Sequence, residues 1–200
     1  MPQMAPEDIA IGSASRPYPG EMVNGDGWRV DWYHGACRIA VIDGLGHGSQ
    51  AAAAADAALN TLSVHPELSP KEALTACHTA LLSTRGAAIS IVTIDSASEE
   101  LIYAGIGNVD GHLVRQGRQE HLVANRGIVG AALPSVRASS FRLHTEWLLL
   151  MHTDGIRSRL HVEDLPPAVQ TNPQQLADAI LEGWSRETDD ATIVVIRPVG

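Results

Sequence analysis

The sequence predicts an α+β fold in which two stacked, mainly antiparallel sheets are flanked by helices. Three observations support this prediction. Short apolar runs bounded by glycine or acidic residues recur along the 200 residues, helix signals separate some of them, and the two kinds of segment do not alternate as they do in a doubly wound sheet. A hydrophobic fraction of 44% is enough for a packed core. We expect residues 1–200 to form one domain.

The predicted strands are short runs, several of them apolar at almost every position. Continuous apolar character indicates burial on both faces, as in Arg38–Asp43 (RIAVID) and Trp147–His152 (WLLLMH). Short connections with glycine or asparagine, such as 105–108, favour antiparallel pairing. In chain order the predicted strands are Arg38–Asp43, Ile89–Ile94, Leu101–Ala104, His112–Arg115, Glu120–Val123, Ser139–Leu143, Trp147–His152 and Thr192–Arg197, with one more expected just after Asp26.

Three helices are predicted. The first, His47–Val64, is rich in alanine, which favours helix and lets the helix lie close to a sheet. The second starts at Ser69-Pro70-Lys71-Glu72, a capping box with proline at the first helical position. The third starts with the similar signal Asn172-Pro173-Gln174-Gln175. Helices outside the two sheets would cover the apolar strand faces that the sheets do not cover for each other.

Charge and composition exclude several classes of function. The net charge is −9 and Lys71 is the only lysine, whereas a protein that binds nucleic-acid phosphates or an anionic membrane needs clustered basic residues. No apolar run approaches the roughly 20 residues of a membrane-spanning helix, and the N-terminus does not have the pattern of a signal peptide. Two cysteines, Cys37 and Cys77, do not make a disulfide framework. We expect a cytoplasmic monomer.

Aspartates stand at the ends of several predicted strands. Asp43 ends RIAVID and opens the segment DGLGHG, Asp154 follows WLLLMHT, and Asp189 and Asp190 precede TIVVIR. Asp26 lies between two glycines just before a predicted strand. An Asp beside Gly is common in plain turns, so each of these pairs taken singly has an ordinary explanation. Their repetition at strand ends is harder to explain as turn chemistry.

Carboxylates gathered at the edge of a core repel one another unless a cation neutralises them. Mg²⁺ and Mn²⁺ prefer oxygen ligands, and a glycine such as Gly44 can offer its carbonyl at close approach. Two such ions can activate a water and hold a phosphoryl group for in-line attack. The aspartates therefore predict a divalent-cation site suited to phosphoryl chemistry.

Four motifs in register resemble the metal-dependent serine/threonine phosphatases (PPM, type 2C), and within them the bacterial SpoIIE/RsbU/RsbX branch. They are Gly25-Asp26, the segment Asp43–Gly48, Thr153-Asp154-Gly155 and the segment Asp189–Thr192, and the stretch Arg16–Glu21 is also similar to that branch. In length the sequence is most similar to RsbX, the member of this branch that has no further segment attached to its phosphatase domain. The resemblance implies an αββα sandwich and hydrolysis of phosphoserine or phosphothreonine on signalling proteins, without a phosphoenzyme. The implied substrates are STAS-domain proteins of a stressosome.

The resemblance also implies residue roles. Asp43 would bridge two Mn²⁺ or Mg²⁺ ions and the Gly44 carbonyl would complete one site, while Asp154 and Asp189 would ligate the other ion. Asp26 would be a direct or water-mediated ligand and, with Asp43, a catalytic residue. Asp190 would hold a neighbouring water or make an outer contact.

The sequence departs from the eukaryotic type 2C pattern at two positions. Leu45 stands where those enzymes have a histidine after Asp-Gly, and Gly25 stands where they have an acid. His47, two residues further on, is a candidate acid for the leaving group, although a solvent-facing position at the start of the helix is the more ordinary expectation. The group that protonates the leaving alkoxide is left open.

Other chemistries lack their motifs. The sequence has no Cys-x5-Arg, no phosphate-binding P-loop, no Gly-x-Ser-x-Gly elbow, and no histidine pair whose spacing suits zinc. Each histidine is therefore expected to be a surface or strand residue, and Cys77 to lie in a helix core. Two alternatives to a protein phosphatase stay open, a non-catalytic binding module on the same fold and a small-molecule phosphohydrolase.

Overall fold

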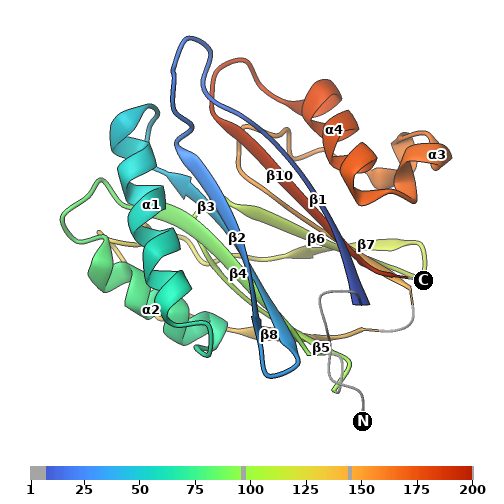
Figure 1. The fold of residues 1–200 in the computed structure, drawn as a ribbon, viewed down its shortest axis with the longest axis horizontal. Coiled ribbons are helices and arrows are strands. Elements are labelled where there is room, and N and C mark those ends of the chain that lie inside the picture. The colour runs from blue at the N-terminus through green and yellow to red at the C-terminus, as the bar shows by residue number, and fades with distance from the viewer. Residues whose placement is uncertain (1–7, 96–97, 144–145, 200) are drawn as a thin grey trace.

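The computed structural model describes residues 8–95, 98–143 and 146–199 of the chain. Two five-stranded sheets stack face to face and carry helices on their outer faces (Figure 1). All strand pairings within the two sheets are antiparallel. This arrangement confirms the predicted fold class. Residues 1–7, where the sequence predicts no signal peptide, lie outside the described residues.

The first sheet holds both ends of the described chain. Its strand order is β1-β10-β9-β6-β7, with β1 Ile9–Arg16, β10 Ala191–Pro198, β9 Trp147–His152, β6 Asp110–Arg115 and β7 Arg118–Leu122. Strand β1 is not among the predicted strands, because small and polar residues interrupt its apolar positions. It is an edge strand that pairs along its whole length with β10.

The second sheet has the strand order β2-β3-β4-β5-β8, with β2 Asp26–Tyr33, β3 Ala36–Gly44, β4 Ala87–Asp95, β5 Glu100–Ile106 and β8 Ser139–Arg142. The predicted strands of both sheets are confirmed, with ends that differ by at most two residues. Differences of this size are normal at the ends of elements.

Helices α1 (Ser49–Val64) and α2 (Pro70–Ala80) cover the second sheet, and α4 (Pro173–Trp184) covers the first. The predicted capping box of α2 is present, since Ser69 accepts from the Glu72 amide and Glu72 accepts from the Ser69 amide. A 3₁₀ turn, Val162–Asp164, and the one-turn helix α3, Pro167–Gln170, were not predicted. Within the described ranges, no helix combines the length and the apolar character needed to cross a membrane.

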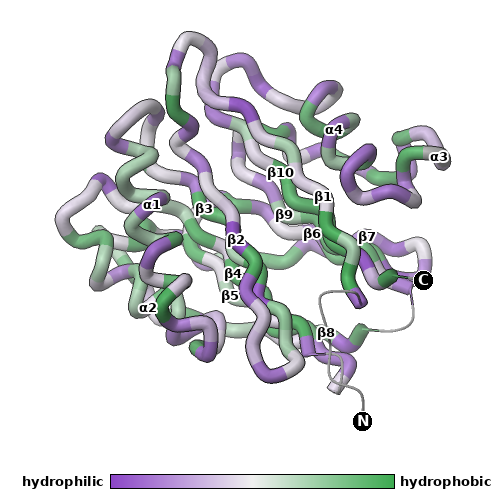
Figure 2. Tube along the Cα trace, viewed as in Figure 1, coloured by the Kyte–Doolittle hydropathy of each residue, from purple (hydrophilic) through white to green (hydrophobic). Residues whose placement is uncertain are grey.

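The core has three layers, and hydrophobic residues follow the strands through all of them (Figure 2). The middle layer lies between the sheets, and each outer layer lies between a sheet and its helices. In α1 the side facing the second sheet consists mainly of alanines, of which Ala51, Ala54 and Ala58 are fully buried. Their small side chains let the helix backbone lie close to β2 and β3, as the alanine content predicts. Cys77 is fully buried in the same layer, as predicted.

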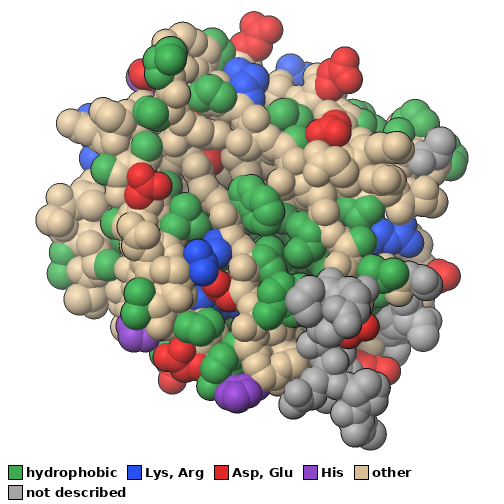
Figure 3. Space-filling view, viewed as in Figure 1, with side chains coloured by type: hydrophobic (Ala, Val, Ile, Leu, Met, Phe, Trp, Pro, Cys, Tyr) green, Lys and Arg blue, Asp and Glu red, His purple; other side chains and the backbone are tan. Residues whose placement is uncertain are grey.

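The edge strands β1 and β2 border one open side of the sandwich. Half-buried Ile11, Trp28 and Val30 pack against the middle layer from these strands. Figure 3 shows hydrophobic side chains gathered on this face between the two strands. Large side chains thus shield the middle layer where no helix covers it.

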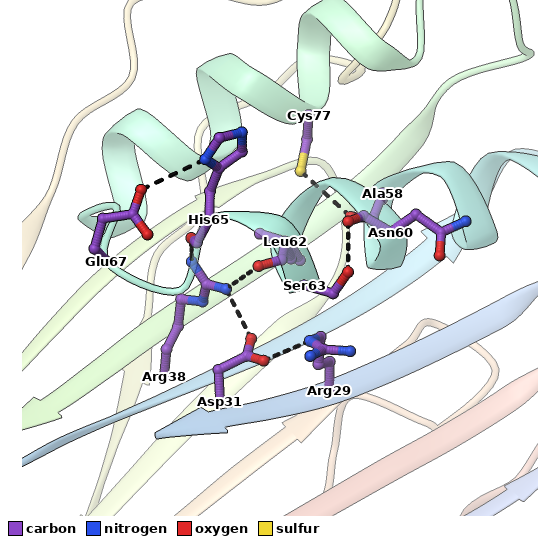
Figure 4. A network of polar contacts seen from close by, with 10 residues as sticks. All are labelled: Arg29, Asp31, Arg38, Ala58, Asn60, Leu62, Ser63, His65, Glu67 and Cys77. Atoms are coloured by element: carbon purple, nitrogen blue, oxygen red, sulfur yellow. Dashed lines mark hydrogen bonds and ion pairs between the residues drawn. The ribbon is translucent and has the colours of Figure 1, made fainter. Parts of the chain in front are cut away.

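A buried arginine ties α1 to the second sheet (Figure 4). Arg38 on β3 is 2% exposed and donates to the carbonyl oxygens of Leu62 and His65, at the end of α1, over 2.5 Å each. Its guanidinium also donates to Asp31 on β2 over 2.7 Å, and Asp31 accepts from Arg29 as well. The charge lies where the helix dipole favours a cation and orphan carbonyls need donors.

Replacing Arg38 tests this connection. We expect Arg38→Ala to lower the free energy of unfolding by about 3 kcal/mol, because it removes the buried cation paired with Asp31, leaves that carboxylate only the more exposed Arg29, and removes the bonds to the carbonyls of Leu62 and His65. Arg29→Ala is the matched control, since Arg29 is the more exposed partner of the same carboxylate and exposed pairs contribute about 1 kcal/mol or less. Urea unfolding measures both values, and equal losses would contradict the role of Arg38.

Candidate metal centre

The candidate site begins with two aspartates on neighbouring strands. Asp26 opens β2 and Asp43 lies near the end of β3, directly opposite it in the antiparallel register. Opposite residues of a strand pair project from the same face. That face is the one turned to the other sheet, because Val41 and Ile39, two and four positions before Asp43, belong to the middle core layer. Two carboxyl groups are thus held at the rim of the core.

The end of β9 supplies the next groups. Thr153 is fully buried, donates its hydroxyl to Asp26 over 2.7 Å and accepts from the Thr192 amide over 3.0 Å. Asp154 follows it and accepts from the Asn108 side chain over 2.6 Å. These bonds fix the direction of one carboxylate from each sheet.

The loop before β10 supplies two more carboxylates with different surroundings. Asp189 is half-buried and lines a small pocket together with Asp43 and Asp154. Asp190 is 3% exposed, and one of its oxygens accepts from the Tyr18 amide over 2.8 Å. Its Oδ2 is buried without a hydrogen-bond partner within the described part of the chain.

Gly25 and Gly44 allow these loops to come together. A Cβ at Gly25 would come within 2.7 Å of Asp190 Oδ2, and one at Gly44 within 2.2 Å of the Ala51 carbonyl oxygen. The Gly44 amide donates to the Gly25 carbonyl over 3.1 Å. The acid that the eukaryotic type 2C pattern has before Asp26 therefore has no room here.

The electrostatics of this group is unfavourable without cations. Burial, together with the charges of Asp26, Asp154, Asp189 and Asp190, raises the pKa of Asp43 to about 9. Burial also raises the pKa of Asp26 to about 7, although the Thr153 hydroxyl opposes the shift. The pKa of Asp189 is raised by burial and then by Asp154. Each raised pKa means that ionising a further carboxyl group in this cluster costs free energy.

The donor set fits hard divalent cations. Five carboxyl groups supply oxygen ligands only, and Asp190 carries a buried oxygen with no partner among the described residues. Cations would lower the repulsion that raises these pKa values. Mg²⁺ and Mn²⁺ prefer such oxygen sets. The structure thus brings together Asp26, Asp43, Asp154 and Asp189, the four aspartates predicted as ligands, with Gly44 beside them.

A pocket of about 240 Å³ opens over the carboxylates, and His47 lies at its edge. The His47 ring stacks on Tyr18 with 4.3 Å between ring centroids, and its Nδ1 lies 2.9 Å from a Glu21 oxygen. The side chain is about half exposed. His47 is therefore both solvent-facing, as expected, and held beside the pocket that contains Asp43.

Two arginines near the site differ in what they contact. Arg16 donates to the carbonyl oxygens of Pro17 and Arg186, so its guanidinium is engaged. The guanidinium of Arg85, a residue that no sequence motif indicates, lies beside Gly46, which lines the pocket. Arg85 comes close to the pocket only in the folded chain, because the connection between α2 and β4 brings it to the loop that contains Gly46.

Comparison with known proteins identifies the family. The sequence pattern of the Stage II sporulation protein E (SpoIIE) family matches residues 33–199, which is most of the chain. No curated protein matches the sequence directly. The chain belongs to the SpoIIE family.

Solved structures agree with this assignment. One similar structure is described in terms of the bacterial stressosome, a modular system adapted to control secondary messenger signalling. It is 28% identical to this chain, with a TM-score of 0.87 over 96% of this chain and 100% of that one. RsbX in complex with magnesium is 19% identical, with a TM-score of 0.86 over 98% of each chain. The catalytic domain of the serine/threonine phosphatase PstP with two manganese ions is 16% identical, with a TM-score of 0.71 over 96% of this chain and 99% of that one.

These findings confirm the resemblance to the SpoIIE/RsbU/RsbX branch of the PPM phosphatases. By family and fold, this SpoIIE-family chain is a metal-dependent protein phosphatase. The expected cofactor agrees with two of the similar structures, one of which holds magnesium and the other manganese. The roles of the individual aspartates rest on the geometry described above and are taken up as a proposal below.

His112 and His152 are strand residues, on β6 and β9, as expected. The fold also brings them together with Asp110 on the outer face of the first sheet, a grouping that the sequence spacing did not indicate. These residues are far apart in the chain and become neighbours only through the pairing of β6 with β9. A sequence pattern of fixed spacing could not have found them.

The raised pKa values predict how the stability of the metal-free protein depends on pH. The folded state holds protons on Asp26 and Asp43 that the unfolded chain releases near pH 4, so stability falls as pH rises from about 4 to about 9. The slope is at most about 1.4 kcal/mol per pH unit for each such carboxyl. Thermal unfolding in a chelator at several pH values measures it.

Asp43→Asn should remove most of this loss at pH 8 and should weaken the stabilisation by Mn²⁺. Asp56→Asn, which removes an exposed carboxylate of α1, should keep the pH dependence of the original chain. A metal-free protein whose stability does not fall between pH 5 and 8 would contradict the repulsion argued for the site.

Proposed function

We propose that the chain hydrolyses phosphoserine or phosphothreonine on STAS-domain signalling proteins through a two-cation centre. The observation that carries this proposal is the convergence of five carboxyl groups from both sheets beside one small pocket. The stressosome context of the 28% identical structure supports the choice of substrate class. The products are the free hydroxyl side chain and inorganic phosphate, with water supplying the added oxygen.

The ligand roles follow from position. Asp43 faces every other carboxylate of the site and would contact both cations, with the Gly44 carbonyl on one of them. Asp154 and Asp189 line the same pocket and would hold the other cation. Asp26, which lies opposite Asp43 in the strand pair, would bind directly or through water. When bound, Mn²⁺ or Mg²⁺ supplies Lewis-acid polarisation of the phosphoryl group and lowers the pKa of a water.

Neighbouring residues orient the ligands. Thr153 donates to Asp26, and Asn108 donates to Asp154, so each carboxylate presents its free oxygen in one direction. Asp190 accepts from the Tyr18 amide and so holds the Tyr18 segment near Gly25. This contact supports the outer role expected for Asp190, with Asp189 as the ligand.

The pocket favours a protein substrate over a small molecule. Its volume of about 240 Å³ lies below the roughly 300–1,000 Å³ of sites that enclose small ligands. It accommodates a phosphoryl group and the end of a side chain, while the rest of a protein substrate lies outside. A non-catalytic binding module would have no use for five mutually repelling carboxylates.

Phosphate release tests the proposal. We expect a serine-phosphorylated STAS-domain protein to be dephosphorylated only with Mn²⁺ or Mg²⁺. Asp43→Asn should reduce the rate by roughly 100-fold or more, since it removes charge where the transition state needs it. Asp56→Asn should retain the rate. Equal rates on para-nitrophenyl phosphate and the phosphoprotein would favour the small-molecule alternative, and no release from folded protein would favour the binding module.

We propose His47 as the group that protonates the leaving alkoxide. Its position at the pocket edge, held by Glu21 and Tyr18, supports this role. His47→Ala should lower kcat on the phosphoprotein by about 100-fold, the lower range for acid–base catalysis. It should change the rate on para-nitrophenyl phosphate far less, because nitrophenolate leaves without a proton. The same loss on both substrates would contradict the role.

We further propose that residues 1–200 act as one phosphatase domain in the cytoplasm. The near-complete coverage of both chains in the comparison with the stressosome structure supports a single domain. Cys37 and Cys77 are buried thiols that form no disulfide, which supports a reducing compartment.

A further inference from the structure

A second group of ligand-type side chains lies on the opposite face of the first sheet from the aspartates. Asp110 and His112 come from β6, His121 from β7 and His152 from β9. The register pairs Asp110 with His152, and His112 with both His121 and Leu150. Leu150 belongs to the outer core layer, so all four side chains project from the outer face of the sheet.

Three of these residues are close enough to share one ion. One ligand atom each from Asp110, His112 and His152 lies within 4.8 Å of the others. The rings of His112 and His152 stack with 5.6 Å between centroids. His121 contributes from the rim, where its Nε2 lies 3.1 Å from an Asp110 oxygen. The group therefore has two imidazoles and a carboxylate at its centre and a third imidazole beside it.

Both central histidines carry a buried nitrogen without a partner. Nε2 of His112 and Nε2 of His152 are inaccessible to solvent and make no hydrogen bond among the described residues. His112 is 7% exposed and His152 is 0% exposed. An unsatisfied buried polar group costs about 1–3 kcal/mol, whereas the neighbouring outer-face position holds Leu150 at no such cost. Two unsatisfied nitrogens in neighbouring rings indicate a ligand that binds both of them.

The tautomer of His152 is the one that a metal requires. Its Nδ1 lies 3.0 Å from the Thr153 carbonyl oxygen, which can only accept, so Nδ1 carries the proton. The lone pair of the neutral ring is then on Nε2. A backbone carbonyl in this position orients metal-binding histidines in many proteins. Burial lowers the pKa of His112 to about 4, so that ring is also neutral.

The site also has an entrance. A pocket of about 390 Å³ is lined by His112 and His121 from the sheet and by His161 and Glu163 from the segment that crosses above it. An ion could reach His112 through this pocket without opening the core. The acidic centre lies on the other face of the sheet, so the two sites have separate approaches.

We propose that Asp110, His112 and His152 form a transition-metal site that binds Zn²⁺, with His121 as an outer or fourth ligand. Two imidazoles and one carboxylate are a common ligand set for zinc, and imidazole nitrogen selects against Mg²⁺. The site differs from the acidic centre in donor type, location and metal preference. Its bound ion would fix the end of β9, from which Thr153 and Asp154 extend toward the acidic centre.

Calorimetric titration of the full chain with zinc chloride tests the proposal. The titration is repeated with the Asp43→Asn variant, because this substitution weakens zinc binding at the acidic centre. We expect one zinc site to persist in Asp43→Asn. His112→Leu, which places an apolar side chain beside Leu150, should weaken that site by about 100-fold or more, since even loss of an outer partner costs 10–100-fold. His65→Ala is the matched control, because His65 is an exposed histidine beside a carboxylate.

Asp110→Ala gives a second route should His112→Leu fail to fold, because Asp110 is partly exposed and its replacement perturbs the core least. In the Asp43→Asn background, zinc should raise the melting temperature with or without the added His65→Ala, but not after His112→Leu or Asp110→Ala is added. Unchanged zinc affinity in both His112→Leu and Asp110→Ala would overturn the proposal. Loss of all zinc binding in Asp43→Asn would overturn it as well, because the zinc would then occupy the acidic centre.

Discussion

The mutual repulsion of carboxylates at the rim of the middle core layer is the constraint around which this structure is arranged. The fold gathers them although burial and their neighbours raise the pKa of Asp43 to about 9 and that of Asp26 to about 7. Most of the sandwich is apolar and could be stable without them. The free-energy cost of gathering these carboxylates is explained if divalent cations bind between them in the folded state, as expected for a PPM-type phosphatase.

The two sheets have complementary tasks at this rim. The second sheet supplies Asp26 and Asp43 from one strand pair, and the first sheet supplies Asp154 and the loop before β10. Thr153 connects them by bonding both to Asp26 and to the β10 backbone. The relative position of the sheets therefore sets the distance between ligands, so the packing of the middle layer and the chemistry of the site depend on each other.

The sequence predicted the parts of the fold whose signals are local. The apolar runs gave the strands of both sheets except β1, whose alternating small and polar residues resemble a loop, and the capping signals gave α2 and α4. The aspartates were found because each follows or precedes such a run. The cluster of Asp110, His112 and His152 was missed because it depends on strand register, which no local pattern contains. Arg85 was missed for a similar reason.

The central claim is that the carboxylates around Asp43 bind catalytic divalent cations. The most direct measurement is a crystal structure of the protein with Mn²⁺, using anomalous scattering to locate the ions. We expect manganese bound to the Asp43 carboxylate, with further bonds to Asp154 or Asp189. Ordered protein with Mn²⁺ in excess and no anomalous density beside Asp43 would contradict it.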